Sequence, residues 1–251
     1  MNQAPRSTVN DVTPDQDADA SGRDVLRWSE VFDSLQGEGV NIGKPCRFVR
    51  LSLCNLHCHY CDTKYTWDFQ QFDYDTEVRE ASLDAFAEQL RSAPAGHVVI
   101  TGGEPLLQQR ALARVFERVP RELFIEIETN GTRVPLPALR ERVDQWNVSP
   151  KLASAGDPEP LRIRPEALTA LRDTGRAFLK LVVKTPADRD EAEALRARFD
   201  FPRDRTLLMP EASTREELEA RSTEVAGWSQ ALAVRFSSRL HIALWGGRRA
   251  T

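Results

Sequence analysis

The sequence predicts an α/β fold whose mostly parallel sheet closes only part of a barrel. Stretches rich in β-branched, aromatic and aliphatic residues alternate with stretches whose apolar residues recur at helical spacing, a pattern typical of βαβ units. Polar or glycine-rich sequence follows nearly every strand-like stretch. The full eight repeats of a closed barrel are absent from the sequence, so an open or partial barrel fits better. The expected strands cover residues 25–35, 46–53, 97–101, 123–128, 145–148, 177–183 and 206–209.

Helices are expected in the segments that separate these strands. Ser82 is a suitable N-cap for segment 83–90, whose apolar residues recur at intervals of three and four. A turn at 36–39 follows the first strand. Other helices are expected at about 106–119, 165–173, 187–199 and 214–233, and a last extended piece covers 236–244.

Composition and charge exclude several classes of protein. The net charge is −4 and no basic run is present, so a dedicated nucleic-acid binder is not expected. No apolar stretch approaches the roughly 20 residues that span a bilayer, and the N-terminus does not resemble a secretory signal. Three of the four cysteines lie together, which favours a reduced, cytoplasmic setting. Residues 1–24 are expected to be a disordered tail, followed by a single domain over 25–251.

The most informative stretch holds Cys54, Cys58 and Cys61 in the spacing C-x3-C-x2-C. Three thiolates can hold an iron–sulfur cluster, which usually takes four protein ligands. The fourth iron would then keep an open coordination position, as catalytic metal sites do. A structural zinc site completed by His57 or His59 explains the same ten residues equally well, so both interpretations stay open at this point.

Three strand ends carry residues that are suited to ligand binding: Thr101-Gly102-Gly103-Glu104-Pro105, Glu128-Thr129-Asn130-Gly131 and Ser149-Pro150-Lys151. Because ligands of barrel-type folds bind at the carboxyl ends of the strands, these motifs indicate one shared site. Each motif also has a simpler explanation as a turn. Glu104 could pair with an ammonium group. Glu126 and Glu128 share one strand face, which either binds something or faces solvent.

Single polar residues within apolar strands give further candidates. Arg50 needs an anionic partner, and its planar guanidinium suits a carboxylate, unless it faces solvent beside Arg47. His241 lies in the last extended piece, where a lone histidine is usually a core residue. We assign His97 to structure and expect Cys46 to be a small buried hydrophobe.

Together these motifs resemble the radical S-adenosylmethionine (SAM) superfamily. With Leu35-Gln36-Gly37-Glu38-Gly39, Phe48-Val49-Arg50-Leu51 and Arg239-Leu240-His241-Ile242 added, the sequence resembles, within it, the 7-carboxy-7-deazaguanine synthase family of the queuosine pathway. A glycyl-radical activase would share the cysteines and Gly-Gly-Glu-Pro, but not the turn at 36–39 or Cys61-Asp62-Thr63. The resemblance covers about residues 28–246. Its carriers are Leu35-Gln36-Gly37-Glu38-Gly39, Phe48-Val49-Arg50-Leu51, the cysteine motif with Asp62-Thr63, the three strand-end motifs, and Arg239-Leu240-His241-Ile242.

The resemblance implies a modified, partial TIM-type barrel, a homodimer, and a carbon–nitrogen lyase that uses a 4Fe-4S cluster, SAM and Mg²⁺. The implied reaction converts 6-carboxy-5,6,7,8-tetrahydropterin to 7-carboxy-7-deazaguanine with release of ammonia. An electron donor such as flavodoxin is implied as a partner, and no nucleic acid or membrane.

The resemblance also implies a role for individual residues. The cluster ligands are Cys54, Cys58 and Cys61, and Thr63 binds Mg²⁺, whereas His57 and His59 have no role. Glu128 and His241 are weaker substrate-contact candidates. Tyr60 stands where the family often has tryptophan. The SAM contacts are Tyr60, Cys61, Asp62, Gly103, Ser149, Pro150 and Lys151, and the substrate contacts are Leu35, Gln36, Gly37, Arg50 and Thr101.

Overall fold

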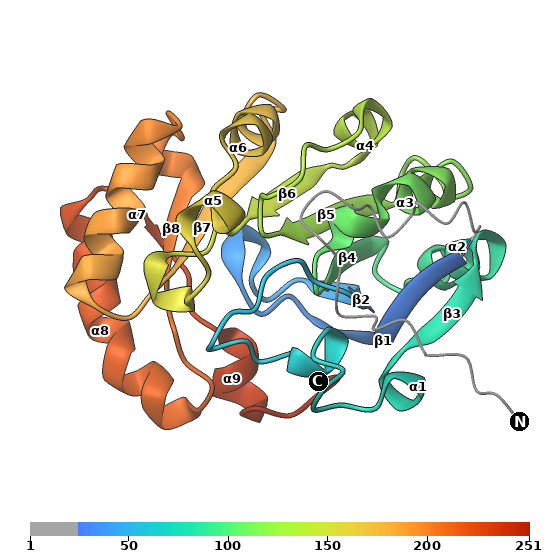
Figure 1. Cartoon of the computed structure of the whole chain (residues 1–251), viewed down its shortest axis with the longest axis horizontal. Helices are drawn as coiled ribbons and strands as arrows, with labels where there is room; N and C mark the ends of the chain where they lie inside the picture. The colour runs from blue at the N-terminus through green and yellow to red at the C-terminus, as the bar shows by residue number, and fades with distance from the viewer. Residues whose placement is uncertain (1–24) are drawn as a thin grey trace, which may run out of the picture.

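The computed structural model describes residues 25–251, and the tail expected at 1–24 lies outside the described residues. Figure 1 shows one curved sheet with helices along its outer side. The strand order is β3-β1-β2-β4-β5-β6-β7-β8-β9. The strands are β1 (Val25–Leu35), β2 (Pro45–Leu51), β3 (Arg79–Ser82), β4 (His97–Gly102), β5 (Phe124–Thr129), β6 (Gln145–Val148), β7 (Ala177–Val183), β8 (Thr206–Pro210) and β9 (Arg235–Phe236).

The sheet is mostly parallel, as predicted. From β2 through β9 each neighbouring pair is parallel, whereas β1 is antiparallel to both β2 and β3. The carboxyl ends of the parallel strands therefore meet at one edge of the sheet, where ligands bind in such folds. The two edges of the sheet are not paired with each other in the described strand order, which makes the barrel partial.

The helices that connect the parallel strands cover the outer side of the sheet (Figure 1). Ser82 caps α2 by accepting a hydrogen bond from the amide of Ala85, and α2 buries the apolar face predicted for it. The main helices are α2 (Leu83–Arg91), α3 (Gln109–Phe116), α4 (Pro137–Arg142), α6 (Pro165–Arg172), α7 (Pro186–Arg198) and α8 (Arg215–Ala231); shorter ones are α1 (Tyr74–Glu77), α5 (Glu159–Arg162) and α9 (Leu240–Trp245).

The core lies between this outer layer and the sheet. Leu90, Ile100, Leu112, Trp146 and Leu171 are fully buried members of one continuous cluster. Within residues 25–251, no helix has both the length and the apolar composition needed to cross a membrane.

The prediction of an extended piece over 236–244 is wrong. Only the first residue of that range is in a strand, β9, and Leu240–Trp245 form helix α9. The alternation of Leu240, Ile242 and Leu244 suggests a strand, but only Ile242 is buried, against Ala212, while Leu244 is 45% exposed. His241 therefore projects from a short helix rather than from a strand.

Two glycines let the end of β4 approach the segment that follows β2. The amide of Gly103 donates to the carbonyl of Leu51 over 2.9 Å, and the amide of Glu104 donates to the carbonyl of Leu53 over 2.8 Å. A Cβ atom at Gly103 would lie 1.9 Å from the carbonyl oxygen of Leu53, and one at Gly102, whose φ is +129°, would lie 2.1 Å from that of Leu51. Side chains are thus excluded at both positions.

We predict that Gly103→Ala destabilises the fold by about 2 kcal/mol, because the added methyl group overlaps backbone atoms that cannot move aside. Gly227→Ala is the matched control. Gly227 lies within α8 with no atom near its missing Cβ, so alanine should stabilise the fold by about 1 kcal/mol through helix propensity. Urea unfolding measures both changes, and equal stability of the two variants would contradict the prediction.

Candidate active site

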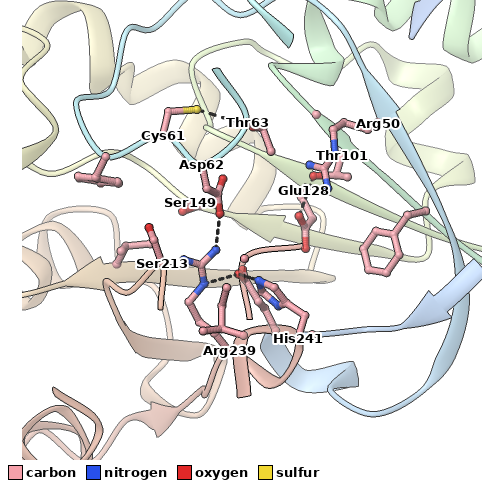
Figure 2. Close-up of a pocket in the computed structure, with 18 of the residues that line it drawn as sticks. Arg50, Cys61, Asp62, Thr63, Thr101, Glu128, Ser149, Ser213, Arg239 and His241 are labelled. Carbon is pink, nitrogen blue, oxygen red and sulfur yellow. Dashed lines mark hydrogen bonds and ion pairs between the residues drawn. The ribbon is translucent and has the colours of Figure 1, made fainter. Parts of the chain in front are cut away.

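One cavity of about 460 Å³ opens at the carboxyl edge of the sheet, and Figure 2 shows its lining. Nearly all of the predicted site residues line it, although they come from five separate segments of the chain. Pro150 is the exception; it lies buried between Ser149 and Lys151, which do line the cavity. The other predicted residues that line the cavity are Leu35, Gln36, Gly37, Arg50, Cys54, Cys58, Tyr60, Cys61, Asp62, Thr63, Thr101 and Gly103.

The loop with the three cysteines forms one wall of the cavity. It begins directly after Leu53, the residue whose carbonyl accepts the Glu104 amide and whose φ is +77°. The sulfur of Cys61 accepts a hydrogen bond from the indole of Trp67 at 3.3 Å. The loop is also held from outside, because the amide of His59 donates to the carbonyl of Ala155.

The cysteine thiols are suited to binding a metal group. Burial raises the pKa of Cys58 to about 11 and raises that of Cys54 further, so both are neutral thiols in the chain alone at pH 7. A bound metal removes such protons, because it stabilises the thiolate. Three soft donors that face one cavity match the ligand set of an iron–sulfur cluster.

The zinc alternative fits less well. In the described part of the chain, no three His, Cys, Asp or Glu side chains converge closely enough to hold a single metal ion. A zinc ion needs its ligands about 2.0–2.3 Å from one point, whereas a cluster of four irons spreads its sulfur ligands apart. Neither histidine lines the cavity. His59 packs on Gly156, and the His57 ring lies 5.0 Å from the ring of Trp67.

Arg50 faces the cavity from β2 and has an anionic partner, so the alternative in which it faces solvent beside Arg47 is wrong. Its Nε donates to Glu30 at 2.8 Å, directly across the β1–β2 ladder, while Arg47 pairs with Asp33 further along. Glu30 also accepts from the hydroxyl of Tyr65 at 2.9 Å. Glu30 thus fixes the Nε side of the guanidinium, and Arg50 lines the cavity.

The two glutamates of β5 point into the barrel, so the solvent-face interpretation is wrong. Glu128 lines the cavity and accepts from the hydroxyl of Thr101 at 2.8 Å. Glu126 lies below it and is fully buried. Burial would raise the pKa of Glu126, but hydrogen bonds lower it below the ordinary value. The donors are His97, Asn41, Gln36 and Asn147.

Glu104 is bound within the protein, at the end of β4. It is fully buried and accepts hydrogen bonds from the amides of Leu106 and Asn130 and from the hydroxyl of Thr129. Burial raises its pKa in spite of these bonds. Glu104 therefore joins the Gly-Gly turn to the end of β5. Cys46, as predicted, is buried, beside Phe48.

Sequence reasoning missed part of the lining. Lys180 lies within β7 and pairs with Glu38. Glu38 also accepts a hydrogen bond from Nε of Arg239 at 3.0 Å. Glu211 and Ser213 follow β8 and line the cavity as well. The signal for the last two was present, because polar residues follow a strand there. Lys180 could have been found in the same way as Arg50, because each is a cation inside an otherwise apolar strand.

The comparisons with known proteins agree with this arrangement. Residues 49–155 match the model of the radical SAM superfamily. The chain is 38% identical to the 7-carboxy-7-deazaguanine synthase of Pyrobaculum aerophilum, over 89% of this chain and 96% of the relative. For that of Halobacterium salinarum the identity is 36%, over 94% and 97%. The crystal structure of QueE from Escherichia coli has a TM-score of 0.65 at 26% identity, covering 88% of this chain and 96% of that one.

A partial barrel with a three-cysteine loop at the carboxyl edge of its sheet, together with the family match, defines a radical SAM enzyme. Membership of this superfamily implies a 4Fe-4S cluster and SAM. The relatives narrow the assignment, since they are more than 30% identical over most of both chains: the protein belongs to the 7-carboxy-7-deazaguanine synthase family.

We predict that Glu38→Gln lowers the free energy of unfolding by about 3 kcal/mol at pH 7, because it removes the carboxylate that the buried cations Lys180 and Arg239 share. Burial would raise the pKa of Glu38, but Lys180 and Arg239 lower it well below the ordinary value of 4.5. The stabilisation is therefore present above pH 4.5 and is lost as the pH falls through the lowered folded-state pKa. Between pH 7 and pH 3, the free energy of unfolding should fall less steeply in the variant than in the parent. Parallel curves would contradict this.

Proposed function

We propose that this enzyme converts 6-carboxy-5,6,7,8-tetrahydropterin to 7-carboxy-7-deazaguanine with release of ammonia, using Mg²⁺ in addition to the cluster and SAM. The observation that carries the proposal is that one cavity holds both the three cysteines and, on its other side, Arg50, Thr101 and Glu128. When bound and reduced, the cluster and SAM supply a 5′-deoxyadenosyl radical, which would take hydrogen from C6 of the pterin.

On the cofactor side, the roles follow from position. Cys54, Cys58 and Cys61 would hold the cluster through sulfur. Lys151 donates to the hydroxyl of Ser149 at 3.2 Å, and both line the same cavity as the cysteine loop, where polar groups of SAM can bind. Gly103 would present bare backbone to SAM, since a side chain there is excluded. Tyr60, Asp62 and Pro150 complete the proposed SAM contacts.

On the substrate side, the charges fit an amino-pterin that carries a carboxylate. The terminal nitrogens of Arg50 can bind that carboxylate as a fork. Glu128 offers acceptor oxygens, held by Thr101, to ring N–H and amino groups. Gln36 has its amide nitrogen bound to Glu126 and its amide oxygen bound to the amide of Glu38, so its orientation is fixed. Leu35 and Gly37 flank it, and His241 lies over Gly37.

The test is direct. Anaerobically reconstituted protein is incubated with SAM, a reductant and the carboxy-tetrahydropterin, and the products are analysed by mass spectrometry. We expect a brown protein that forms 7-carboxy-7-deazaguanine and ammonia. Cleavage of SAM without this product would reject the substrate but keep the superfamily, whereas a colourless protein with one tightly bound zinc would reject both.

We predict that Arg50→Ala lowers kcat/KM for the pterin about 100-fold, because the substrate carboxylate loses its charged partner. Uncoupled cleavage of SAM should persist, since Arg50 is not placed on the cofactor side. Arg47→Ala is the matched control, from the same strand but paired with Asp33 outside the cavity, and should keep full turnover. If Arg50→Ala instead loses iron, Arg50 has a structural role and the prediction is wrong.

We predict that Thr63→Ala reduces the stimulation of turnover by Mg²⁺. The hydroxyl of Thr63 lines the cavity 3.7 Å from the sulfur of Cys61, where a hard cation could share it with substrate oxygens. Thr63→Ser keeps the hydroxyl and should keep the stimulation. Turnover is measured over a Mg²⁺ titration after treatment with a chelator, and a parental response of the alanine variant would remove Thr63 as a ligand.

We also propose that residues 25–251 form a single domain and that the protein is a cytoplasmic homodimer. A reductase such as flavodoxin would supply its electrons. These features rest on the family resemblance. Light scattering of the purified protein tests the dimer, and turnover with reduced flavodoxin as the sole electron source tests the donor.

A further inference from the structure

We propose that Arg239 is a positioning residue that couples the SAM side of the cavity to the substrate side. The inference rests on the proposed function and deepens it. Arg239 immediately precedes α9, and Figure 2 shows its guanidinium joined to Asp62 by a dashed line, with His241 beside it. The side chain is only 12% exposed.

All three guanidinium nitrogens of Arg239 are bound, and each reaches a different segment. Nη2 donates to Asp62 at 2.5 Å, directly beyond the last cysteine. Nε donates to Glu38 at 3.0 Å, in the turn expected to recognise the pterin. Nη1 donates to the carbonyl of Ala212, beyond β8. One planar group therefore fixes three loops relative to one another.

The charges around Arg239 make this bridge necessary. Arg239 donates to two carboxylates, Asp62 on one side and Glu38 on the other. Glu38 and Asp62 thus repel each other across the guanidinium. Of these two carboxylates, Lys180 neutralises only Glu38, which it contacts; its other acidic neighbour is Glu128, at 3.8 Å. Without Arg239, the cysteine loop would be pushed away from the 36–39 turn.

The backbone around Arg239 is anchored to the same turn. The amide of Leu240 donates to the carbonyl of Gly37 at 2.8 Å, so α9 begins against the predicted substrate segment. A Cβ at Gly37 would lie 2.2 Å from the Nδ1 atom of His241, which shows how closely the two segments pack. Because its backbone is fixed against the 36–39 turn, the side chain of Arg239 can hold Asp62 at a set distance from that turn.

Arg239→Gln tests the coupling in the reconstituted enzyme. We expect KM to rise at least tenfold for both SAM and the pterin, and product formed per 5′-deoxyadenosine to fall at least fivefold. Arg239→Lys keeps a charge but cannot reach both carboxylates, so it should give intermediate values. The lysine variant also covers the case in which Arg239→Gln does not fold.

A second readout uses the protein without cluster or SAM. Hydrogen–deuterium exchange should quicken in Arg239→Gln at both residues 54–66 and residues 36–44, because the shared anchor is gone. Arg142→Gln is the matched control. Arg142 is also buried and donates to an acid, Asp144, and to the carbonyls of Pro120 and Leu123, but it lies away from the cavity. It should lower the melting temperature while leaving exchange at both loops and the product ratio as in the parent.

The proposal is overturned if Arg239→Gln keeps the parental KM values and product ratio, or if it behaves as Arg142→Gln does. It is also overturned if only one of the two loops exchanges faster, since coupling requires both. If the parent forms no deazaguanine, the proposed function has failed, yet the exchange measurement still decides whether Arg239 joins the two loops.

Discussion

The close backbone contact between the end of β4 and the segment after β2 determines where the site lies. Gly102 and Gly103 approach the carbonyls of Leu51 and Leu53 so closely that any side chain would overlap them. Since Cys54 follows immediately, this contact sets the start of the cysteine loop against the Gly-Gly turn. Glu104 extends the same contact to β5 through its bonds to Thr129 and Asn130. Backbone contacts therefore set the position of the wall that we propose for the cofactor.

The side of the cavity that we propose for the substrate is formed by side chains inside the barrel. Buried carboxylates are costly unless they are bound, and each one here has partners. Glu126 is held by neutral donors below the cavity, whereas Glu38 is held by Lys180 and Arg239. Glu128, between them, is held by Thr101 and keeps access to the cavity. Polar groups that are fixed in this way can bind a polar heterocycle without rearrangement.

Much of this could be predicted from the sequence, because parallel strands bring their carboxyl ends to one edge. The cysteine spacing and the motifs after β4, β5 and β6 were enough to predict one shared site. Long-range pairing was not predictable. Nothing in the local sequence indicates that Arg50 faces Glu30 or that Arg239 reaches Asp62, because those contacts depend on register and on loop paths. The sequence does not reveal the short helix α9 for a related reason, since alternation over a few residues does not show which side chains are buried.

The central claim is that the three cysteines leave one iron open for SAM in the same cavity that receives the pterin. Electron–nuclear double resonance of the reduced, reconstituted protein with SAM labelled at its amino nitrogen and carboxylate oxygen tests it most directly. We expect hyperfine coupling of both labels to the cluster, and a changed coupling once the pterin is added. Absence of coupling from either label, in protein that retains its cluster, would contradict the claim.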